Sequence, residues 1–259
     1  MSEKSVDAQE LLQLAVKVSH EAAHLLLQRP SNFDINQKSS AVDFATQMDH
    51  ASEKLIVESL LAARPDDGII GEEGANRPST SGITWVIDPL DGTVNYFYDL
   101  PGWNVSIAAK DESGVIVGVV NAPTINSLWT ATRGGGAFLN GAPIRCKDPI
   151  TLDRALIGTG FSYSLEKRVG QAEFVRSLIP RVRDIRRGGA AAVDLCHVAT
   201  GAYDGYFEMD LNEWDLAAGG LIATEAGVIV TGRNGGIAGK EMVIAAGPAL
   251  HGVLVTEIG

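Results

Sequence analysis

The spacing of the apolar residues changes along this 259-residue chain, and the changes limit the folds open to it. In residues 1–30 the apolar positions recur with the helical period, and Pro30 ends the pattern. A second helix is predicted over about 49–64. From Gly68 the chain turns to short β-rich runs separated by turn residues.

The β-rich part gives way after about Asp148 to helices that alternate with short strands. A polar turn at Gly114 predicts a hairpin between two of the β-rich runs, which are GII, TWVI, WNVSIAA, GVIVGVV and SLWTAT. Helices are predicted near 165–179, 190–200 and 214–226, and strands near 155–158, 203–208 and 242–246. Two closely joined sheet-and-helix halves in an α/β chain are the expected architecture.

Composition excludes several classes of protein. No apolar run approaches the roughly 20 residues that span a membrane, and the N-terminal MSEKSVDAQE lacks a secretory pattern. Cys146 and Cys196 form no CxxC pair, so we expect a cytoplasmic protein without a disulfide framework. The net charge of −11 argues against nucleic acid as a partner. An acidic protein would also repel a phosphate ester unless cations offset the field.

The strongest local feature is Trp85-Val86-Ile87-Asp88-Pro89-Leu90-Asp91-Gly92-Thr93. An apolar strand runs into two aspartates three residues apart, and Gly92 permits a tight turn after them. Carboxylates at a strand end and in the following loop suit a hard cation. A helix beginning after Gly92 would also offer free N–H groups to a phosphate. The alternative is that Asp88 and Asp91 only cap turns.

Two further acidic elements have the same two interpretations. Glu72 and Glu73 lie between two glycines, just after a short apolar run. They could be either a solvated surface pair or metal ligands. Asp215 lies just ahead of the helical segment LAAGGLIATEAG, in the first turn of the predicted helix, where an acid also complements the helix dipole. Together with Asp88 and Asp91 these residues indicate a magnesium site, because Mg²⁺ prefers oxygen ligands. The histidines form no ligand motif, and we interpret His20 and His24 as surface residues.

The conjunction of spaced motifs resembles the inositol monophosphatase family over nearly the whole chain. The segments that carry the resemblance are KSSAVDFATQMD, IIGEEG, WVIDPLDGTVNY, RGGGAFLNGAPI and EWDLAAGGLIATEAG. The resemblance implies a layered αβαβα sandwich of the inositol monophosphatase and fructose-1,6-bisphosphatase type. It implies one domain over 1–259, with a metal-binding half over about 1–147 and a substrate-side half over about 148–259.

The resemblance also assigns a role to each matching position. It places two or three Mg²⁺ on Glu72, Asp88, Asp91, Asp215 and the carbonyl of Leu90. Asp49 and Thr93 match the pair that orients and deprotonates the attacking water, with Glu72 beside them. The predicted substrate contacts are Asp91, Gly92, Thr93, Gly189, Ala190, Ala191, Glu208 and Asp215. Without the resemblance, Asp49 would be only an acid at the start of the second helix.

The implied activity is Mg²⁺-dependent hydrolysis of a small phosphate monoester by in-line attack of a water activated by the metal. The family is commonly homodimeric and inhibited by lithium. Glu208, which matches a residue that binds inositol hydroxyls, favours inositol-1-phosphate. Ala190 departs from a frequent threonine, and histidinol phosphate, fructose bisphosphate or a nucleotide 3′-phosphate remain alternatives.

Two points remain open at this stage. Arg183, Arg186 and Arg187 form a basic cluster that could bind a second phosphate, reach a partner subunit's site, or lie on a solvated strand. A non-catalytic regulatory or RNA-associated protein of the same fold is a third hypothesis for the whole chain. The complete set of acidic residues and the negative charge count against it.

Overall fold

The computed structural model describes residues 7–40 and 43–258. Residues 1–6 of the N-terminal segment, and 41–42 within the motif KSSAVDFATQMD, lie outside the described residues. The helices are α1 (Ala8–Leu27), α2 (Gln47–Ala63), α3 (Thr93–Phe97), α4 (Leu165–Leu178), α5 (Ala191–Thr200), α6 (Glu213–Glu225) and α7 (Pro248–Ile258).

The strands form a hairpin and two larger sheets. The hairpin pairs β1 (Ile35–Ser40) with β2 (Asp43–Thr46). The larger first sheet has the order β10-β9-β8-β7-β6-β5-β3-β4, and the second has the order β12-β11-β13-β15-β14. The first sheet contains β3 (Gly68–Gly71), β4 (Asn76–Arg77), β5 (Thr84–Asp91), β6 (Asn104–Asp111), β7 (Gly114–Ala122), β8 (Ser127–Thr132), β9 (Gly136–Leu139) and β10 (Ala142–Pro143). The second contains β11 (Leu156–Thr159), β12 (Asp184–Arg186), β13 (Gly205–Glu208), β14 (Ile229–Thr231) and β15 (Val243–Ala246).

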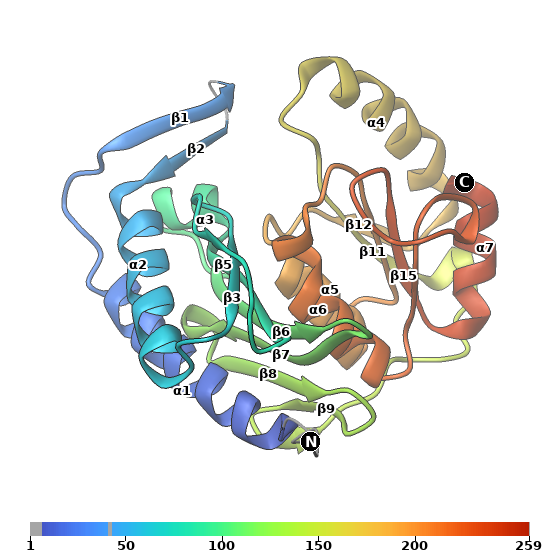
Figure 1. Cartoon of the computed structure of the whole chain (residues 1–259). Helices are drawn as coiled ribbons and strands as arrows, with labels where there is room; N and C mark the ends of the chain where they lie inside the picture. Colours follow the sequence, from blue (N-terminus) through green and yellow to red (C-terminus); the bar gives the residue numbers. More distant parts are fainter. Residues whose placement is uncertain (1–6, 41–42, 259) are drawn as a thin grey trace.

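The elements stack in the layer order αβαβα (Figure 1). Helices α1 and α2 pack on one face of the first sheet, and α5 and α6 pack on the other. The same α5 and α6 contact the second sheet, whose far side is covered by α4 and α7. The expected layered fold is therefore confirmed.

Alternating side chains on the central strands divide the apolar core in two. On β5, Trp85 and Ile87 join the cluster under α1 and α2, whereas Val86 joins the cluster under α5 and α6. Strand β5 is buried on both faces, which explains why its first half, up to Ile87, is apolar without alternation. A third cluster lies between the second sheet and the outer helices.

The middle helices are built from small residues because they are covered on two sides. Helix α6 has almost no polar face, as expected for a helix buried between two sheets. Gly118 on β7 lies against the backbone of Ala218, and Gly219 lies against Ala192 on α5. These glycines let the helix layer approach the first sheet and let the two helices approach each other.

Most predicted elements are confirmed within a few residues, including the hairpin turn before Gly114. One prediction needs correction. Asp91 was expected in the loop after a strand, but β5 continues through Asp91, with an irregularity in its pairing between Asp88 and Asp91. The β1–β2 hairpin and α7 were not predicted. In the described residues, no helix is both long and apolar enough to cross a membrane.

The contact between Gly118 and Ala218 yields a stability prediction. A Cβ at position 118 would lie 2.8 Å from the Ala218 carbonyl oxygen and 3.0 Å from its Cα, both backbone atoms that cannot turn aside. Gly118→Ala should therefore lower the unfolding free energy by about 1–3 kcal/mol in urea denaturation. Gly252→Ala is the matched control, because its Cβ meets no atom within 4 Å in helix α7 and should leave stability unchanged or slightly higher.

Candidate active site

A cavity of about 240 Å³ lies at the end of β5, bounded by the starts of α3, α5 and α6. It gathers residues from distant parts of the sequence. Every predicted site residue except Asp49 lines it, namely Glu72, Asp88, Leu90, Asp91, Gly92, Thr93, Gly189, Ala190, Ala191, Glu208 and Asp215. Asp49 does not line the cavity, but its carboxylate accepts a hydrogen bond from the cavity residue Thr93.

The end of β5 shows the turn-capping contact and also places both aspartates at the cavity. The Leu90 N–H donates to Asp88 Oδ1 at 3.1 Å, which is the turn-capping contact. The same two residues line the cavity, so capping and ligand roles are compatible. Gly92 takes φ = 87°, as expected for a tight turn, and helix α3 begins at Thr93, which meets the condition for offering N–H groups to a phosphate. The free N–H groups at the start of α3 belong to the segment that lines the cavity.

Asp91 is held by donors from both halves of the chain. Asn104 Nδ2 on β6 and the backbone N–H of Ala192 on α5 each donate to Asp91 Oδ2 at 2.9 Å. Burial raises the pKa of Asp91 to about 6, the charge of Glu72 acts in the same direction, and these two donors oppose it. The carboxylate therefore has a fixed orientation at the junction of the first sheet and α5.

Asp49 and Thr93 form a hydrogen-bonded pair beside the cavity. Thr93 Oγ1 lies 2.9 Å from Asp49 Oδ1 and 3.2 Å from the Leu90 carbonyl oxygen. Asp49 Oδ2 accepts the Thr46 N–H at 2.8 Å, so it also caps the start of α2. Burial raises the pKa of Asp49, although hydrogen bonds from Thr46 and Thr93 lower it. The capping role expected without the resemblance and the contact with Thr93 thus coexist.

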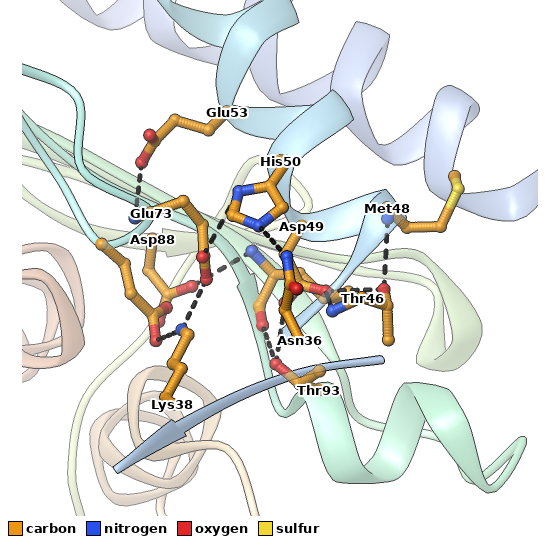
Figure 2. Close-up of polar contacts among 12 residues, drawn as sticks. Asn36, Lys38, Thr46, Met48, Asp49, His50, Glu53, Glu73, Asp88 and Thr93 are labelled. Atoms are coloured by element: carbon orange, nitrogen blue, oxygen red, sulfur yellow. Dashed lines mark hydrogen bonds and ion pairs between the residues drawn. The ribbon is translucent and has the colours of Figure 1, made fainter. Parts of the chain in front are cut away.

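The Glu72–Glu73 turn is held by residues that the sequence analysis did not single out. Lys38 on β1 contacts Glu72 Oε1 at 2.8 Å and Glu73, and His50 Nδ1 lies 3.5 Å from Glu73 Oε2 (Figure 2). Although burial lowers the pKa of Lys38, the two glutamates raise it above its ordinary value. The buried Glu53 accepts the Glu73 N–H at 2.9 Å and so anchors the turn from behind.

The opposite wall comes from the second half of the chain. Gly189 takes φ = 93°, and the neighbouring Gly188 carbonyl accepts a hydrogen bond from Asn95 Nδ2 at 2.9 Å. Asp215 Oδ2 accepts the Asn212 N–H at 2.6 Å and caps α6. The position of Asp215 is therefore fixed. The second acid in this part of the site, Glu208, is also held in place, by a residue of its own strand β13.

That residue is Tyr206, whose buried hydroxyl donates to Glu208 Oε2. Gly160 leaves room for the carboxylate of Glu208, since a Cβ at that position would overlap it. Burial raises the pKa of Glu208 to about 7, although the Tyr206 hydroxyl lowers it. Glu208 is thus an aligned acceptor at the edge of the cavity.

The acidic residues of the cavity carry more negative charge than their protein neighbours offset. Burial, followed by the charges of Glu72 and Asp91, raises the pKa of Asp88 well above its ordinary value. Burial and Glu72 do the same for Asp215. Such a set of oxygen donors, mutually repelling in a buried site, fits a hard divalent cation.

The side chains are not, however, arranged as a finished metal site. Among the described residues, no group of three or more His, Cys, Asp or Glu side chains has the geometry to hold a metal ion. One reason is that the Lys38 ammonium is paired with Glu72. Another is that one predicted ligand, the Leu90 carbonyl, is a backbone group. A cation held by Glu72 would have to displace the Lys38 ammonium from that carboxylate.

The basic cluster divides in the structure. Arg186 pairs with Asp184 on β12, whereas Arg187 lines the cavity. Arg183 is exposed and does not line the cavity. Asn104 and Lys38 are the most consequential residues that the sequence analysis left without a role. Each contacts an acidic residue elsewhere in the sequence. The acidic motifs could be recognised from the sequence, but these contacts to them could not.

The crowding of acids predicts a pH dependence for the metal-free protein. The folded state keeps a proton on Asp91 between pH 3.8 and about 6, whereas the unfolded chain loses it. The unfolding free energy should therefore fall as pH rises through this window, at up to about 1.4 kcal/mol per pH unit from this group. Asp91→Asn removes the titrating carboxyl and should flatten the decline measured by urea denaturation in EDTA.

Glu112→Gln is the control for this measurement, because Glu112 lies exposed in the β6–β7 turn. It should keep the wild-type pH dependence. An Asp91→Asn profile as steep as the wild-type profile would contradict the electrostatic account of the cavity.

Comparison with known proteins agrees with this geometry. The sequence model of the inositol monophosphatase family matches residues 7–258. Inositol-1-monophosphatase SuhB of Mycobacterium tuberculosis is 41% identical over 236 residues, covering 86% of this chain and 81% of its own. Nus factor SuhB of Escherichia coli is 39% identical over 231 residues, covering 87% and 86%.

Solved structures show the same relationship. The extragenic suppressor protein suhB of Bartonella henselae has a TM-score of 0.91 at 33% identity, covering 96% of this chain and 98% of its own. The Thermotoga maritima IMPase has a TM-score of 0.88 at 30% identity, covering 96% of each chain. With a family match across almost its entire length and the family's acidic motifs around one cavity, this chain belongs to the inositol monophosphatase family.

Proposed function

We propose that the chain is a Mg²⁺-dependent phosphatase that hydrolyses the phosphate monoester of a small polyol, with inositol-1-phosphate as the first candidate substrate. The supporting observation is the gathering of Glu72, Asp88, Asp91 and Asp215 around one cavity, beside the Asp49–Thr93 pair. With the Leu90 carbonyl, these residues would hold two or three Mg²⁺. Bound there, Mg²⁺ would polarise the phosphoryl group and lower the pKa of the attacking water.

Asp49 and Thr93 are proposed to handle the proton of that water. The Thr93 hydroxyl donates to Asp49, so its free lone pairs can accept a hydrogen bond from water. The proton then passes toward Asp49, whose burial raises its pKa and makes it a better acceptor. Glu72, across the cavity, would help to orient the same water.

The phosphate and the leaving group would lie on opposite sides of the reacting centre. The N–H groups of Gly92 and Thr93 would donate to phosphate oxygens at the start of α3. Glu208 and the loop Gly189–Ala191 would contact the polyol, with Glu208 accepting hydrogen bonds from its hydroxyls. This arrangement assigns the substrate side to the C-terminal half and most of the metal side to the N-terminal half. We extend the proposal to a homodimer sensitive to lithium.

The proposal predicts phosphate release from inositol-1-phosphate that requires MgCl₂ and stops in EDTA. Histidinol phosphate, fructose 1,6-bisphosphate and a nucleoside 3′-phosphate should react more slowly, because Glu208 and its fixed carboxylate suit a polyol. The assay measures kcat/KM for each ester. Preference for another ester would keep the chemistry and replace the substrate, whereas no release from any ester would contradict the proposal.

Asp49→Asn separates proton handling from metal binding in the same assay. Its kcat should fall about 10²–10⁴-fold, the usual contribution of a positioned general base. The MgCl₂ concentration for half-maximal melting-temperature increase should stay unchanged, since Asp49 does not line the cavity. Equal losses in metal binding and turnover would show that Asp49 is a structural residue.

The name Nus factor SuhB, carried by relatives at 38–40% identity, supports a second candidate. In that case the chain would act as a Nus factor, with or without hydrolysis. A net charge of −11 disfavours direct RNA binding and favours a protein partner. A chain with this role alone would release no phosphate in the assay above.

A further inference from the structure

The side chain of Asn104 lies beside Asp91 in a way that its own packing does not explain. Asn104 opens β6 and is completely buried. Its Nδ2 donates to Asp91 Oδ2 at 2.9 Å, across the pairing of β6 with the end of β5. The other half of the amide, Asn104 Oδ1, is buried without a hydrogen-bond partner among the described residues.

A buried carbonyl oxygen without a donor opposes folding, because water would satisfy it in the unfolded chain. Exchanging the amide oxygen and nitrogen would not relieve this, since the oxygen would then face the Asp91 carboxylate. An apolar residue of the same size would avoid the unpaired atom altogether. Asn104 is therefore best explained by what it donates to Asp91.

A second hydrogen-bond donor to Asp91 Oδ2 helps to fix the orientation of the carboxylate. The Ala192 N–H, from the first turn of α5, also reaches Asp91 Oδ2 at 2.9 Å. Two donors on one oxygen, one from the first sheet and one from the middle helix layer, restrict the rotation of the carboxylate. Donors of this kind around a metal ligand fix its orientation and commonly change metal affinity 10–100-fold.

We propose that Asn104 is a positioning residue that aligns the Asp91 carboxylate for the divalent cation. The inference rests on the proposed metal site and goes beyond it by naming a residue outside the acidic set. Asn104 does not line the cavity, so it would act through Asp91, which does.

The test compares Asn104→Leu with wild type in a metal titration. Affinity is measured by the rise in melting temperature with MgCl₂ and by electron paramagnetic resonance of bound Mn²⁺. Asn104→Leu should weaken metal binding about 10–100-fold. In EDTA its melting temperature should stay close to the wild-type value, because removing the unpaired carbonyl and losing the donor to Asp91 act in opposite directions. Asn104→Ala is the second variant in case leucine cannot pack, with the same expected loss of affinity.

Asn121→Leu is the matched control. Asn121 is also a buried asparagine of the first sheet, but its Nδ2 donates to the Ser19 carbonyl at 3.2 Å on α1. This variant should lower the melting temperature and leave metal affinity unchanged. Wild-type metal affinity in both Asn104 variants would overturn the inference. Absence of any metal response in the wild-type protein would instead overturn the proposed function, and this inference with it.

Discussion

The constraint on which the rest of the structure depends is the burial of like charges at the end of β5. Asp88 and Asp91 are nearly inaccessible. Burial raises the pKa of both, the charge of Glu72 raises both further, and the charge of Asp215 does the same for Asp88. Two carboxylates in a site of low polarity repel each other strongly unless cations or donors offset them. The described residues supply Lys38 and a few amide donors, which offset only part of this charge. Under the proposed function, a bound cation would offset the charge that remains.

The layered fold is what makes this crowding tolerable. Strand β5 is enclosed by the helix layers on both faces, so its end cannot open to solvent without breaking two apolar clusters. Small residues in α5 and α6 bring the second half of the chain against the first, and the Ala192 N–H reaches Asp91 as a result. A cation bound as proposed would also reconcile a net charge of −11 with an anionic substrate.

Local sequence patterns predicted most of the helices and most of the strands, because the apolar period of α1 and the β-rich runs of β6 and β7 are set within each segment. The acidic motifs and the turn at Gly92 were also visible, whereas a helix after Gly92 was considered only as a condition. Tertiary pairing was not visible. Asp91 belongs to a strand because β6 pairs with it, and the role of Asn104 depends on that pairing. The contact of Asp49 with Thr93 spans 44 positions, and only the family resemblance predicted it.

Diffraction from crystals soaked in MnCl₂, recorded at the manganese absorption edge, tests the central claim most directly. The account predicts anomalous peaks between Glu72, Asp88, the Leu90 carbonyl and Asp91, with another near Asp215, and Lys38 withdrawn from Glu72. The claim concerns where the cation binds, so the positions of the peaks decide it. Peaks only at surface acids, or none in this cavity while Lys38 stays at Glu72, would contradict it.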